Sequence, residues 1–279
     1  MKVYAVTPAL NEEQNLRQVL PDLARALHAA GYAFQICVVD DGSKDDTAAV
    51  CKELAAELPV CVQSHPRNLG VGAAFRTGFR WALTLANNED AIVTLEADNT
   101  ADLSILPCML GRLRDGADLV LASCYAPGGY VIGTTVARRL LSHGANLLLR
   151  RAFSLGGIHT YSAFYRGYRA RLLRQAEQAY GGRLVECSGF VCMVEVLVKL
   201  HTLTGAIVEV PTSLRADLRA GRSKMRVLRT IWGYLRFIWQ AARHWGLGRG
   251  DRRRRLQARY RPGLPPTGQP AQSNAPTCT

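Results

Sequence analysis

Short runs of β-branched and aliphatic residues alternate with amphipathic segments over the first half of the chain. The apolar runs predict strands at residues 3–7, 34–40, 60–63, 91–95 and 118–122. Between them, apolar positions spaced by three and four residues predict helices at 11–31, 45–58, 70–85 and 105–113, the first with Asn11 as its N-cap. Strands that alternate with helices are typical of a mostly parallel sheet sandwiched by helices, so we expect an α/β fold.

The pattern is less regular beyond Tyr125. It predicts helices at 135–150 and 191–203, a strand at 206–210 and a basic, aromatic helical stretch at 223–245. The end of the chain is rich in Arg, Pro, Gly, Ser and Gln, a composition typical of disorder. We therefore expect a folded domain over 1–224, an amphipathic helical segment over 225–246 and a basic tail over 247–279.

The charge of the chain is concentrated at its C-terminal end. The 279 residues are 48% hydrophobic and carry a net charge of +13, a composition that excludes a disordered or fibrous protein. From Pro211 onward there are fifteen Lys and Arg against two acids, whereas the residues before it hold twenty of each. Such a basic segment predicts an anionic partner, for which a nucleic acid, a membrane surface and a phosphorylated substrate are all open.

The expected location is the cytoplasm. The eight cysteines are irregularly spaced without a CxxC pair, which favours reduced thiols over disulfides or zinc. The first apolar run is too short for a signal peptide, and no run approaches the about 20 apolar residues that a membrane span needs.

Polar residues follow four of the predicted strands, where ligands bind in parallel α/β sheets. These segments are Thr7-Pro8 with Asn11-Glu12-Glu13, then Asp40-Asp41-Gly42-Ser43, His65 with Gly70 and Gly72, and Glu96-Ala97-Asp98. The first could be only a capping arrangement and the second only a turn. The glycines do not match the dinucleotide fingerprint, so a Rossmann dehydrogenase is disfavoured.

Glu96 and Asp98 lie two residues apart at a strand end, so their carboxylates point the same way and repel unless a cation lies between them. Carboxylates completed by substrate phosphates are the usual ligands of Mg²⁺ or Mn²⁺ with a nucleotide diphosphate. The pair therefore predicts a Mg²⁺ or Mn²⁺ site.

Five motifs in this order resemble the family 2 glycosyltransferases of GT-A fold, most of all those that use dolichol phosphate or polyprenyl phosphates. The fifth motif is Gly221-Arg222-Ser223-Lys224, and the resemblance spans residues 3–224. It implies a metal held by Glu96 and Asp98, although the family usually has Asp at the first position. It also implies a nucleotide-sugar site made by Pro8, Asn11, Glu12, Asp40, Asp41, Arg67, Arg219, Arg222 and Lys224.

On the acceptor side, Arg138 and Ser142 match the family's phosphate-binding pair, and their four-residue spacing puts them on one helix face. The family's preceding arginine is replaced by Cys124, and a usual Asp by His159. Glu195 matches the Gly-Phe-x-x-x-x-Glu pattern. It is either a polar acceptor-site residue or a buried carboxylate tied to a basic neighbour. The predicted catalytic residues are Asp98, Arg138, Ser142 and Glu195.

A phosphate acceptor is already an anion at neutral pH, so it needs cations to position it rather than a general base. We therefore predict a metal-dependent, inverting transfer of a hexose from GDP-mannose or a UDP-sugar to a polyprenyl phosphate. Two alternatives stay open: a hydroxyl acceptor, favoured by Cys124, and a non-catalytic descendant that binds a nucleotide sugar or a membrane.

The stretch around Trp232 and Trp239 has apolar residues at helical spacing with arginines between them, as in an interfacial helix on an anionic membrane. This predicts a peripheral protein on the inner face of the membrane. Packing of this helix on the protein's own core, on a second copy or on a membrane-protein partner is the alternative. Nucleic-acid binding is not expected, because no such motif is present.

Overall fold

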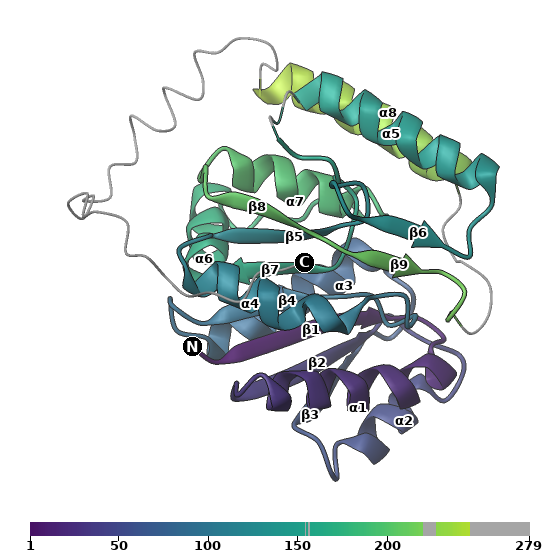
Figure 1. The fold of residues 1–279 in the computed structure, drawn as a ribbon, viewed down its shortest axis with the longest axis vertical. Coiled ribbons are helices and arrows are strands. Elements are labelled where there is room, and N and C mark those ends of the chain that lie inside the picture. Colours follow the sequence, from purple (N-terminus) through teal and green to yellow (C-terminus); the bar gives the residue numbers. More distant parts are fainter. Residues whose placement is uncertain (154, 156, 220–226, 246–279) are drawn as a thin grey trace.

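The computed structural model describes residues 1–153, 155, 157–219 and 227–245 (Figure 1). Its main sheet has seven strands in the order β3-β2-β1-β4-β7-β5-β8. The strands are β1 (Val3–Ala9), β2 (Phe34–Asp40), β3 (Val60–Ser64), β4 (Ala91–Thr94), β5 (Leu119–Ser123), β7 (Arg166–Arg169) and β8 (Ile207–Pro211). All pair in parallel except β7, which is antiparallel to both β4 and β5. The predicted α/β fold with a mostly parallel sheet is confirmed.

Helices bury both faces of the sheet. On one face lie α1 (Glu13–Ala29), α2 (Thr47–Leu54) and α4 (Leu106–Arg114), the last preceded by a 3-10 turn, Leu103–Ile105. On the other lie α3 (Val71–Leu85), α6 (Ala170–Ala179) and α7 (Cys192–His201). Alternate residues of β1 serve the two cores, since Val3 and Ala5 pack on the first set and Tyr4 and Val6 on the second. Burial on both faces explains why the central strands are continuous apolar runs.

Two predicted details were wrong. Asn11 is not an N-cap: its φ is 51°, and its side chain accepts a hydrogen bond from the backbone N–H of Lys44 instead, while Glu12 precedes the helix. Helix α2 ends at Leu54 rather than at residue 58, because the chain turns there. The cysteines at 37, 51, 61, 124, 187 and 192 are free thiols.

Strand β7 and helix α6 escaped prediction. The sequence of β7 is Arg-Gly-Tyr-Arg, which has no run of apolar residues. Arg166 is nevertheless fully buried, and its guanidinium donates hydrogen bonds to the backbone oxygens of Met193 and Tyr161. Two further short strands, β6 (Tyr130–Ile132) and β9 (Ser213–Arg215), pair in parallel outside the main sheet.

Helices α5 (Val136–Phe153) and α8 (Val227–Trp245) lie side by side at one end of the molecule, beyond the main sheet (Figure 1). Phe153 and Phe237 join them, with ring centroids 5.5 Å apart. One face of α8 is therefore packed on the core, whereas Trp232 and Trp239 on its other face are 73% and 55% exposed. None of the described helices is both long and apolar enough to cross a membrane.

Candidate active site

One large cleft lies at the carboxyl ends of the parallel strands and has a volume of about 2440 Å³. Pro8 of β1, Asp41 after β2, Glu96 and Asp98 after β4, and Cys124 after β5 line it. The cleft continues past α7 to α8, where Trp232, Arg236 and Phe237 line its far end. The strand-end segments that the sequence singled out thus meet a surface of α8 in one space.

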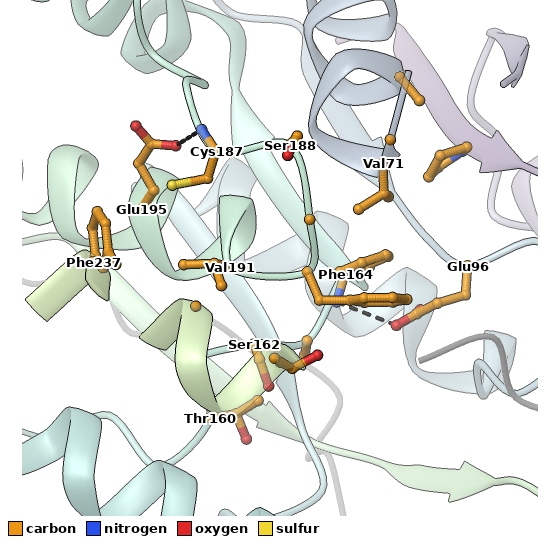
Figure 2. Close-up of a pocket in the computed structure, with 18 of the residues that line it drawn as sticks. Val71, Glu96, Thr160, Ser162, Phe164, Cys187, Ser188, Val191, Glu195 and Phe237 are labelled. Atoms are coloured by element: carbon orange, nitrogen blue, oxygen red, sulfur yellow. Dashed lines mark hydrogen bonds between the residues drawn. The ribbon is translucent and has the colours of Figure 1, made fainter. Parts of the chain in front are cut away.

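Glu96 and Asp98 face this cleft with most of their oxygens already engaged. The backbone N–H of Phe164 donates to Glu96 Oε1 over 3.3 Å (Figure 2). The hydroxyl of Thr100 donates to Asp98 Oδ1 over 2.6 Å, and the guanidinium of Arg219 donates to Asp98 Oδ2. Burial, and next the charge of Asp98, raise the pKa of Glu96 to about 7. A cation beside Glu96 would stabilise its charged form.

The aspartates after β2 hold the loops of the cleft together. Asp41 Oδ1 lies 2.7 Å from His65 Nδ1, and the backbone N–H of Gly70 donates to Asp41 Oδ2 over 2.8 Å. Asp40 Oδ1 accepts from the backbone N–H of Ser43 over 2.9 Å, which is the turn arrangement considered from the sequence. Both aspartates are buried, but only Asp41 is part of the cleft lining.

The first-strand loop is tied to the second-strand loop. The backbone N–H of Asn11 donates to Ser43 Oγ over 2.8 Å, and that of Glu12 donates to Thr47 Oγ1 over 2.8 Å. Glu12 lines the cleft beside Pro8. Asn11 and Arg67 are exposed and lie outside the lining.

Gly70 and Gly72 have a packing role that sequence reasoning missed. A Cβ on Gly72 would lie 1.8 Å from the carbonyl oxygen of Cys187, and one on Gly70 2.4 Å from that of Ser188. Instead, the backbone N–H of Gly72 donates to the Ser188 oxygen over 3.0 Å. The glycines therefore let the loop before α7 press against the start of α3, where both line the cleft. The Gly-x-Gly spacing in the sequence indicates a close backbone contact, but the loop that makes this contact is known only from the structure.

Glu195 is the anchor of that loop. It is 2% exposed, and its Oε2 accepts from the backbone N–H of Glu186 over 2.9 Å. The same oxygen accepts from the backbone N–H of Cys187 over 2.8 Å (Figure 2). Its Oε1 lies 2.6 Å from Lys199 Nζ, which also donates to Glu186. This geometry favours the alternative of a buried carboxylate tied to a basic neighbour.

The acceptor-side residues lie on α5 and after β5. Ser142 and Tyr125 both line the cleft, and the ring of Tyr125 packs against that of His143 with centroids 4.8 Å apart. Arg139 also lines the cleft, whereas the side chain of Arg138 is outside the described part of the structure. Burial raises the pKa of the Cys124 thiol to about 12, so it is neutral and cannot replace the charge of an arginine.

Comparison with known proteins decides the family. The profile of Glycosyl transferase family 2 matches residues 4–176. The chain belongs to glycosyltransferase family 2. It is therefore a transferase, as the motifs predicted.

Two curated relatives are similar over most of this glycosyltransferase. Polyprenol monophosphomannose synthase of Mycolicibacterium smegmatis is 33% identical over 227 residues, which cover 80% of this chain and 81% of that protein. Dolichol-phosphate mannosyltransferase of Pyrococcus furiosus is 31% identical over 240 residues, 86% of this chain but 63% of that longer protein.

Among solved structures, glucosyl-3-phosphoglycerate synthase from Mycobacterium tuberculosis, in complex with Mn²⁺ and UDP-glucose, is 20% identical with a TM-score of 0.60. The match covers 85% of this chain and 78% of that one. At this identity the likeness shows the fold alone, and it agrees with the predicted GT-A architecture.

The glycosyltransferase thus brings together only part of the predicted donor site. Pro8, Glu12, Asp41 and Arg219 line the cleft with Glu96 and Asp98, whereas Asn11, Asp40 and Arg67 are not part of its lining. Arg222 and Lys224 lie outside the described residues. Across the described chain no group of three or more His, Cys, Asp or Glu could hold a metal ion by itself. Glu96 and Asp98 fit a hard divalent ion whose remaining ligands would come from a bound diphosphate.

Proposed function

We propose that this glycosyltransferase moves a hexose from a nucleotide-diphosphate sugar to a polyprenyl phosphate at a membrane surface. The observation that carries the proposal is the continuity of the cleft, which runs from Glu96 and Asp98 to the half-exposed helix α8. A soluble donor can enter at the strand ends while a lipid acceptor reaches the same space along α8. The names of both curated relatives, which specify mannose and a polyprenol or dolichol phosphate, make GDP-mannose the first donor to test.

The chemistry requires positioned cations and no free base. A bound Mg²⁺ or Mn²⁺ on Glu96 and Asp98 would neutralise charge on the leaving diphosphate. Arg139 and the hydroxyl of Ser142 line the part of the cleft beside Tyr125, where they can orient an acceptor phosphate. Glu195 is held by two backbone N–H groups and Lys199, so it is poorly placed to take a proton. The attacking phosphate oxygen carries no proton that must be removed. Because it attacks in line with the leaving diphosphate, the configuration at the sugar's anomeric carbon is inverted.

A donor and acceptor panel tests this function. The protein is incubated with labelled GDP-mannose, UDP-glucose and UDP-N-acetylglucosamine, each with a polyprenyl phosphate and with the corresponding polyprenol. We expect a labelled lipid only with the phosphate, at a rate that falls to background in EDTA and returns with Mn²⁺. The product should have the anomeric configuration opposite to that of the donor. Transfer to the polyprenol instead, or retention of configuration, would contradict the proposal and favour the hydroxyl-acceptor alternative.

We further propose that α5 and α8 form the membrane-contacting surface of a peripheral protein on the cytoplasmic face. Their exposed apolar residues are Val136, Leu140, Leu141, Leu147, Leu148, Trp232, Leu235 and Trp239. Arg236 and Arg243 border this surface, and the Arg243 guanidinium lies 3.8 Å from the centre of the Trp239 ring. Apolar residues flanked by arginines are typical of a surface that inserts at an anionic interface. The catalytic unit would then be 1–224, with 225–246 as one membrane element and α5 as a second.

Substitution of the two exposed tryptophans tests the surface. Trp232→Ser together with Trp239→Ser should weaken binding to anionic phospholipid vesicles by about tenfold or more. The reason is that the double variant lacks the two exposed indole rings that would insert between the lipids. Flotation or co-sedimentation measures it, with Leu85→Ser, an exposed residue of α3, as the control. Deletion of α8 is a poor substitute, because Tyr234 and Phe237 belong to the core. Unchanged vesicle binding of the double variant would contradict this assignment and leave a second copy or a protein partner to cover the surface.

A further inference from the structure

Both carboxylate oxygens of Asp98 are occupied by the protein itself. Thr100 donates to Oδ1 through its hydroxyl and its backbone N–H. Oδ2 accepts from Nη2 of Arg219, in an ion pair whose two side chains are 20% and 16% exposed. Arg219 follows β9, 121 residues along the chain from Asp98, so the pair joins two separate walls of the cleft. A metal ion that binds Oδ2 must either share this oxygen with the positively charged guanidinium or displace it.

Arg219 also has an unused donor inside the cleft. Its Nε is buried and has no hydrogen-bond partner within the part of the chain that the structure describes. A buried N–H without a partner is costly, and a planar guanidinium matches the oxygens of a phosphate as well as those of a carboxylate. Because Arg219 lines the cleft, a phosphoryl oxygen of a bound donor can satisfy this group.

We propose that Arg219 is a placeholder cation: before the donor binds, its guanidinium occupies the position beside Asp98 Oδ2 that the metal ion later takes. When the metal and the donor bind, the guanidinium moves from Asp98 to the donor diphosphate. The inference rests on the proposed role of Glu96 and Asp98 as metal ligands. While the donor is absent, the positive charge of Arg219 on Asp98 opposes a second cation at the same oxygen. When a diphosphate is present, the displaced guanidinium gains a new anionic partner, so metal and diphosphate bind cooperatively. Free metal is then bound weakly, and the site assembles around the complete donor.

The competing interpretation is a fixed ion pair that only anchors the segment after β9. A pair of that kind lies at the end of β9, where Arg215 Nη2 is 2.8 Å from Asp217 Oδ2 at the surface. Arg215 is not part of the cleft lining. Arg215→Gln is therefore a matched control, because it removes the same charge from the end of β9 without touching Asp98.

The experiment measures Mn²⁺ binding to the full-length protein without any nucleotide, by the electron paramagnetic resonance signal of free Mn²⁺. We expect Arg219→Gln to bind Mn²⁺ about fivefold or more tightly than wild type, since the competing charge is gone. Arg219→Lys, which keeps the charge, should stay close to wild type, and so should Arg215→Gln. Thermal melting of each variant confirms that it is folded.

A second measurement follows the other half of the exchange. With Mn²⁺ saturating, Arg219→Gln should bind GDP or UDP about fivefold or more weakly than wild type, because the diphosphate loses its guanidinium. A placeholder cation predicts that Arg219→Gln raises the affinity for Mn²⁺ alone and lowers the affinity for the nucleotide. An arginine with a purely structural role would change neither affinity. Equal Mn²⁺ affinity in wild type and Arg219→Gln, an equal gain in Arg215→Gln, or no Mn²⁺ binding by any of these proteins would each overturn the inference. Neither measurement involves sugar transfer or lipid, so a failure of the acceptor assignment would not alter its outcome.

Discussion

Asp98→Asn is expected to lower the initial rate of sugar transfer by about 10²- to 10³-fold, the usual effect of removing one group that stabilises charge on a leaving group. Asparagine has nearly the shape of aspartate and can still accept the hydrogen bonds of Thr100, so the loop after β4 should keep its conformation. The change therefore removes the charge and, with it, the ion pair to Arg219, while the contacts of Thr100 remain. It leaves Glu96 as the remaining carboxylate of the pair.

The rate is measured with saturating donor and acceptor over a range of Mn²⁺ concentrations. Asp102→Asn is the matched control: it removes a carboxylate four residues away that accepts from Ser104 and Ser213 and does not line the cleft. This control should retain most of the wild-type rate. An Asp98→Asn enzyme within about threefold of wild type at every Mn²⁺ concentration would show that Asp98 carries no charge essential to the reaction.

The ends of the strands could be located from the sequence because burial fixes their composition. Strands covered on both faces are continuous apolar runs, so the first polar residues after them, such as Asp41 and Glu96, mark the carboxyl edge of the sheet. This is why four separate segments of the chain could be assigned to one site. Which of their side chains face the cleft could not be predicted, because Asp40 and Asp41 are adjacent and differ only in which way the turn directs them.

The elements that escaped prediction are those whose stability comes from distant partners. Strand β7 is held by β4 and β5 on either side, and Arg166 is satisfied by carbonyl oxygens of two other segments. No local pattern encodes such contacts. The same limit applies to Gly72, whose small size matters only because Cys187, 115 positions later, passes over it. The sequence singled out Gly72, but its physical role required the fold.

The loop before α7, which lines the cleft, is held by the buried pair of Glu195 and Lys199. Breaking this pair is expected to have a large effect on stability. Lys199 is 1% exposed and donates to Glu195, to Glu186 and to the backbone oxygen of Arg183. Lys199→Met should lower the free energy of unfolding by about 3–5 kcal/mol, because Glu195 would keep a buried charge without its counter-ion. Urea denaturation measures the loss, and Lys52→Met on the exposed side of α2 should change stability by about 0.5 kcal/mol or less.

A double substitution separates the charge effect from simple misfolding. Glu195→Gln combined with Lys199→Met removes both charges, while a glutamine oxygen can still accept from the backbone N–H of Cys187. The double variant should therefore recover more than half of the lost stability. Residue 195 positions the loop that packs against Gly70 and Gly72 at the start of α3, so Lys199→Met alone should also weaken donor binding. The double variant should bind the donor more tightly than Lys199→Met does. A Lys199→Met protein within about 1 kcal/mol of wild type would show that the pair does not hold this wall.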